Sequence, residues 1–147
     1  MAYRGSLFQS GFRGAEIIPD PGAGNEWSFT PQANQAVELT GISFTLTTAG
    51  GGPARELLLN FTSTLFPGFN FPVVIPAPIA NGTTHTISML RGVDTGTSFT
   101  SNDVININLP EIFFSPTTTL SSLLLGMQAG DAYTDIIVVY RIFNPDA

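Results

Sequence analysis

Residues 37–48, VELTGISFTLTT, decide the fold of this chain. From Ile42 onward, apolar residues alternate with Ser and Thr, so Ile42, Phe44 and Leu46 share one side of an extended chain. In a helix the same spacing would scatter them around the axis. This two-residue period predicts a β-strand with one face in a core, followed by a turn at the three glycines of residues 50–52.

Similar short runs recur along the rest of the chain, separated by Gly, Pro and Asn. We predict further strands at residues 55–62, 83–90, 103–109, 120–127 and 133–143. Leu58 faces away from Leu57 and Leu59, which predicts that its strand is covered on both sides. Apolar residues on both faces of 133–143 predict a central strand. Seven or eight strands at this spacing predict an all-β, antiparallel β-sandwich that is jelly-roll-like.

Residues 65–80 are rich in Pro and Phe, and their missing backbone donors predict an edge strand or a long loop. Three of the aromatic residues, Phe66, Phe69 and Phe71, form a possible contact loop for an oligomer partner or a larger shell. Residues 1–26 contain several glycines and the turn at 19–22, which predicts an extended N-terminal arm ahead of a domain at 27–147.

The composition excludes several classes of partner. The 147 residues suit one domain, and only 11% of them are charged, with a net charge of −6 and no Lys. Binding to nucleic acid is therefore not expected. No apolar run approaches the roughly 20 residues of a membrane span, and the first 13 residues lack the apolar centre of a signal peptide, so we expect an intracellularly made protein.

No catalytic or cofactor-binding residues emerge from the pattern. His85 is the single histidine and lies in an alternating stretch, which favours an ordinary strand residue. There is no nucleophile elbow, no phosphate-binding loop and no set of Cys and His ligands for zinc. Loop carboxylates at Asp94 and Asp103, and at Asp131 and Asp135, leave calcium open, although solvated carboxylates are the simpler interpretation. We expect a protein that is not an enzyme and has no cofactor or metal.

The order of several short motifs resembles that of small virion structural proteins of tailed bacteriophages. The motifs are Trp27-Ser28-Phe29-Thr30-Pro31, Leu46-Thr47-Thr48, Pro53-Ala54-Arg55, Pro76-Ala77, Leu109-Pro110 and Ala129-Gly130-Asp131. The resemblance covers residues 27–143. It departs from the family at Val138-Val139-Tyr140-Arg141, where acidic residues are usual, and residues 1–26 have no counterpart.

The resemblance implies a capsid decoration or cement protein on the exterior of the virion, made in the host cytoplasm. Its partners would be copies of itself, as a homotrimer, and the major capsid protein. We expect the arm to contact a neighbouring capsid subunit through Arg4, Phe8, Phe12 and Arg13. A tail or baseplate component is one alternative. A carbohydrate-binding jelly roll, with Trp27 and Tyr133 as possible sugar platforms, is the other.

Overall fold

The structure is a computed structural model that describes residues 12–33, 35–66, 68, 70–75, 78–91 and 104–143. These residues form ten strands and no helix, which confirms the predicted all-β class. The strands are β1 Phe12–Ile18, β2 Ser28–Phe29, β3 Ala36–Thr47, β4 Glu56–Ser63, β5 Asn70–Val74, β6 Thr84–Leu90, β7 Val104–Asn108, β8 Ile112–Phe114, β9 Thr118–Leu125 and β10 Ala132–Phe143.

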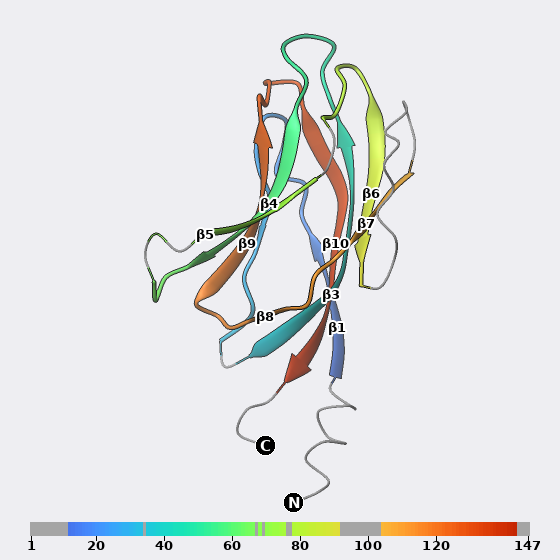
Figure 1. Ribbon diagram of the computed structural model, residues 1–147. Coiled ribbons are helices and arrows are strands. Elements are labelled where there is room, and N and C mark those ends of the chain that lie inside the picture. The colour runs from blue at the N-terminus through green and yellow to red at the C-terminus, as the bar shows by residue number, and fades with distance from the viewer. Residues whose placement is uncertain are drawn as a thin grey trace, which may run out of the picture.

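The strands form two sheets that lie against each other (Figure 1). A six-stranded sheet has the order β1-β10-β3-β6-β7, with β8 also paired to β3, and a four-stranded sheet has the order β2-β9-β4-β5. All pairs are antiparallel except β6 with β7, which run parallel. Four of these pairs are nested along the chain: β1 with β10, β2 with β9, β3 with β6 and β4 with β5. The chain therefore behaves as one long ribbon folded back on itself.

One apolar core lies between the sheets. Ile42, Phe44 and Leu46 are all buried, as their alternation predicts, and Leu57 and Leu59 of β4 are buried opposite them. Trp27 joins this core, with its ring centroid 5.6 Å from that of Phe44. Each fully buried Leu, Ile or Phe side chain in this core contributes about 1.5–3 kcal/mol through the hydrophobic effect. The core accounts for the folding of a chain without cysteine.

Strand β10 is central, between β1 and β3, as predicted for residues 133–143. Inward-facing and outward-facing residues alternate along β10, and this alternation shifts by one residue at Asp135. The φ of Asp135, 53°, lies in the left-handed region. The pairing with β3 shifts between Thr134 and Ile137, which marks a β-bulge. Because of this extra residue, Tyr133 and Ile136 both face the core, although an unbroken strand would turn them to opposite sides.

The structure also refines the two predicted segments outside the main strands. Strand β5 is an edge strand, as predicted for the Pro-rich stretch. Strand β1 lies within the predicted arm 1–26, and its seven residues pair with β10 from Phe12 opposite Ile142 to Ile18 opposite Ile136. Residues 12–18 therefore belong to the six-stranded sheet. Residues 1–11 lie outside the described residues, so an extended arm there stays a prediction.

Candidate functional site

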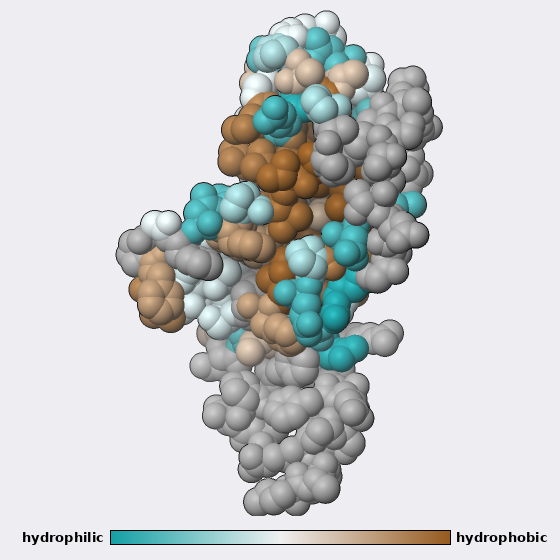
Figure 2. Space-filling view, in the orientation of Figure 1, coloured by the Kyte–Doolittle hydropathy of each residue, from teal (hydrophilic) through white to brown (hydrophobic). Residues whose placement is uncertain are grey.

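Large apolar side chains lie exposed on the outer face of the four-stranded sheet. Val74 lies opposite Leu58, Leu58 lies opposite Leu123, and Leu125 follows two positions along β9. Val74, Leu123 and Leu125 are exposed, and Leu58 is half-buried between its neighbours. We call these four residues the apolar row. Figure 2 shows apolar surface over the upper parts of β4 and β9.

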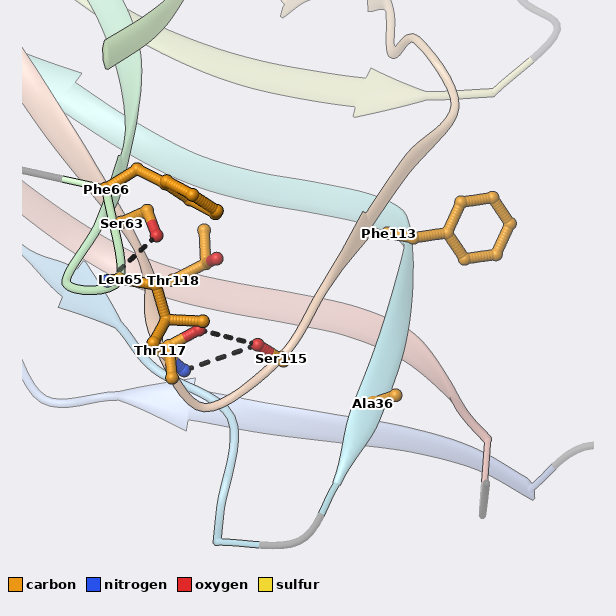
Figure 3. A pocket seen from close by; sticks show the side chains of 8 residues that line it. All are labelled: Ala36, Ser63, Leu65, Phe66, Phe113, Ser115, Thr117 and Thr118. Carbon is orange, nitrogen blue, oxygen red and sulfur yellow. Dashed lines mark hydrogen bonds between the residues drawn. The ribbon is translucent and has the colours of Figure 1, made fainter. Parts of the chain in front are cut away.

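A second apolar surface surrounds an open pocket at the tip of the β4–β5 hairpin. The pocket has a volume of about 500 Å³ and is lined by Ala36, Ser63, Leu65, Phe66, Phe113, Ser115, Thr117 and Thr118. The Phe66 ring extends over it, whereas the Phe113 ring points away from the other lining side chains (Figure 3). None of the eight lining residues titrates, so the pocket suits a neutral apolar group better than acid–base chemistry.

Hydroxyl groups in this pocket are largely engaged with their own loops. The Ser115 and Thr117 hydroxyl oxygens lie 2.8 Å apart, and the Ser63 hydroxyl accepts a hydrogen bond from the backbone N–H of Leu65 at 3.2 Å. These bonds hold the two turns that form the pocket walls. The pocket is therefore shaped by short local contacts on each side of its opening.

The structure places the predicted contact residues in different surroundings. Phe66 is 68% exposed at the pocket, and Phe71 is exposed on β5 with its ring centroid 6.3 Å from that of Phe61. Phe69, Arg4 and Phe8 lie outside the described residues. Phe12 and Arg13 belong to β1 through backbone pairing with Ile142 and Arg141. The described residues therefore bring Phe66 and Phe71 onto one hairpin and place them apart from β1.

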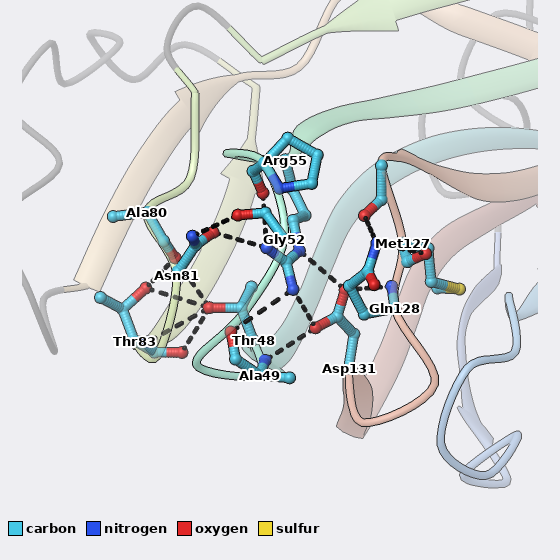
Figure 4. Close-up of polar contacts among 12 residues, drawn as sticks. Thr48, Ala49, Gly52, Arg55, Ala80, Asn81, Thr83, Met127, Gln128 and Asp131 are labelled. Carbon is cyan, nitrogen blue, oxygen red and sulfur yellow. Dashed lines mark hydrogen bonds and ion pairs between the residues drawn. The ribbon is translucent and has the colours of Figure 1, made fainter.

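A buried ion pair between Arg55 and Asp131 organises the opposite end of the molecule (Figure 4). Arg55 Nε and Nη2 each donate to a different Asp131 oxygen at 2.9 Å. Its Nη1 also donates to the Pro53 carbonyl and to Asn81 Oδ1, both at 2.5 Å. The backbone N–H groups of Ala49 and Gln128 donate to Asp131 at 2.7 and 2.8 Å. The pair thus ties together the loops at 48–55, 78–83 and 126–131.

This geometry corrects the interpretation of Asp131 as a solvated loop carboxylate. Both side chains of the pair are fully buried. Burial alone would raise the pKa of Asp131, but hydrogen bonds from Arg55, Ala49 and Gln128 outweigh it and hold that pKa below 3.8. The hydrogen bond to Asp131 raises the pKa of Arg55. Asp131 is therefore an ionised structural group, and it is not available to a metal ion.

The two possible sugar platforms and the single histidine all lie in the core. Trp27 and Tyr133 are buried, so neither offers a face to a sugar ring. His85 is buried on β6, and its Nδ1 has no hydrogen-bond partner among the described residues. It is a strand residue, as expected. Asp94 and Asp103 lie outside the described residues.

Within the described ranges, no group of three or more His, Asp or Glu side chains is arranged to hold a metal ion. The same part of the chain contains no helix long and apolar enough to cross a membrane.

No protein-family model matches the sequence, and no characterised protein matches it in a sequence search.

Proposed function

We propose that this chain is a non-enzymatic structural protein of a phage virion, and that it acts as a capsid decoration or cement protein on the outside of the head. The order of the sequence motifs resembles that of tailed-phage virion proteins, and this resemblance supports a role in a phage particle. The apolar row is the observation that carries the proposed role in association with other proteins, because large apolar side chains on an outer sheet face are expected where another protein covers them.

We further propose that the architecture is a jelly-roll β-sandwich. In the chain, strands β7 and β8 lie between β6 of the third nested pair and β9 of the second, and they are additions to the six-stranded sheet. Without them, the two sheets read β1-β10-β3-β6 and β2-β9-β4-β5. This arrangement follows from rolling up one ribbon of four nested strand pairs, which is the plan of a jelly roll with two Greek keys. Jelly rolls serve in viral particles and in lectins, so the fold supports the proposal without selecting between them.

The proposed mechanism is thermodynamic. A protein that binds only the assembled shell stabilises the shell by mass action, and repetition by symmetry multiplies weak contacts. The sequence-based expectation is a homotrimer whose partner is the major capsid protein, with Arg4, Phe8, Phe12 and Arg13 reaching a neighbouring capsid subunit. No covalent step is needed.

Deletion of residues 2–11 tests the role of the arm. This deletion leaves β1 in place, whereas a deletion extending to residue 20 would also remove a strand of the six-stranded sheet. We expect the shortened protein to keep its thermal unfolding midpoint and to lose binding to purified heads in a cosedimentation assay. Unchanged occupancy of the heads would contradict the proposed arm contact.

Imaging of purified virions with labelled protein tests the location. Label on the head supports the proposal, and label on the tail or baseplate supports the nearest alternative. The carbohydrate alternative loses its two predicted platforms, since Trp27 and Tyr133 are buried.

A further inference from the structure

The outer face of the four-stranded sheet carries very little charge. Besides the apolar row, its outward positions hold Ser28, Asn60, Thr62, Asn70, Pro72, Thr119, Ser121 and Glu56. Glu56 is the single charged residue among them, and it lies at one end of the face beside Leu125. Two identical faces of this composition can approach each other with almost no like-charge repulsion. Apart from Glu56, a strongly charged partner would find no charged side chain on this face to pair with.

The edges of the same sheet are poorly suited to pairing with another chain. Strand β5 carries Pro72 at its middle position, which removes a backbone donor from that edge. Strand β2, at the other edge, has only two residues. Addition of a strand from another molecule is therefore disfavoured at both edges. The four-stranded sheet is therefore expected to contact another molecule through its outer face and not through its edges.

The size of the face fits a reversible contact between two proteins. Its strands contain 2, 8, 5 and 8 residues. With about 3.4 Å per residue and about 4.8 Å between strands, the face covers on the order of 400 Å². Two such faces bury on the order of 800 Å², which lies at the low end for protein interfaces. The expected complex is therefore a weak, reversible dimer.

We propose that this face binds the same face of a second copy of the chain, with the two apolar rows stacked as in the packing of two sheets. This inference deepens the proposed function and rests on it, because it assumes that the chain acts by binding other proteins. Contact between identical patches is isologous and closes as a two-fold dimer. It therefore differs from the homotrimer expected from the sequence, and a mass measurement separates the two.

A pair of matched substitutions tests the contact. Leu125 on this face and Leu90 on the outer face of the six-stranded sheet are both 45% exposed. Analytical ultracentrifugation over a range of concentrations would compare the full-length protein with Leu125→Asp and Leu90→Asp. We expect a monomer–dimer equilibrium in the unsubstituted protein, a dissociation constant at least about tenfold higher in Leu125→Asp, and little change in Leu90→Asp.

Circular dichroism and thermal unfolding establish that each variant is folded, and Val74→Asp provides a second substitution on the same face. A purely monomeric protein, a trimer, or equal effects of Leu125→Asp and Leu90→Asp would overturn the inference. Binding to purified heads is measured separately on the unsubstituted protein. If the protein forms a dimer but does not bind heads, the proposed function is wrong and the dimer contact stands. If it binds heads as a monomer, the proposed function stands and the dimer contact is wrong.

Discussion

At the scale of single residues, the Arg55–Asp131 pair has the clearest energetic consequence. Replacing Asp131 by Asn leaves the Arg55 charge buried without a counterion, since both side chains are fully buried. We expect Asp131→Asn to lower the free energy of unfolding by about 3–5 kcal/mol, measured by denaturant titration. Asp135→Asn is the matched control, because Asp135 is exposed and Asn tolerates its left-handed backbone. A loss below about 1 kcal/mol for Asp131→Asn would contradict this assignment.

The acid limb of unfolding gives a second measurement on the same variant. The pKa of Asp131 is lowered in the folded protein, so its stabilisation is fully present above 3.8 and is lost as the pH falls through the depressed folded-state value. In Asp131→Asn, the side chain at position 131 does not ionise, so this pH-dependent loss of stability is absent. The difference in unfolding free energy between the two proteins should therefore shrink as the pH falls from about 5 toward 2. A constant difference over this range would show that the Asp131 charge is not responsible.

At the scale of elements, the close fit of β1 on β10 depends on Gly14. A Cβ at this position would lie 2.5 Å from Cε2 and 2.8 Å from Cζ of the buried Tyr140 ring. We expect Gly14→Ala to destabilise the fold by about 1–3 kcal/mol in thermal or denaturant unfolding, because the ring or the strand must move. Gly50→Ala is the control, since a Cβ there meets nothing within 4 Å. Equal stability of the two variants would contradict the expected clash between a Cβ at position 14 and the Tyr140 ring.

Gly14 also shows why β1 could not be predicted from the sequence. Its inward positions are Gly14, Glu16 and Ile18, so the apolar alternation that predicts β3 is absent. Gly14 is explained only by the Tyr140 ring, which lies far away in the sequence. Strands β3, β4, β6, β9 and β10 were predictable because their apolar residues alternate or run continuously. The three-residue β8 was too short to show any period.

At the scale of the whole molecule, the candidate surfaces depend on pairings that a linear pattern does not contain. Leu57, Leu58 and Leu59 predict from the sequence that β4 is apolar on both faces. The structure shows in addition that Leu58 lies beside Val74 and Leu123 in one row. The Arg55–Asp131 pair joins residues 76 positions apart. Nothing near either residue in the sequence marks it as buried, so the sequence alone favours a solvated carboxylate at Asp131.

The two proposed contacts of the molecule differ in charge, and salt should separate them. Of the five arginines, Arg55, Arg91 and Arg141 form ion pairs with Asp131 or Glu38, while Arg4 and Arg13 belong to residues 1–26. Added NaCl screens contacts between exposed charges and leaves apolar contacts almost unchanged. Between about 0.05 and 0.5 M NaCl, we expect head binding to weaken severalfold and the dimer dissociation constant to change by less than about twofold. Ultracentrifugation and cosedimentation at matched salt concentrations measure the two constants. A dimer that dissociates with added NaCl would place its interface on charged residues outside the apolar row.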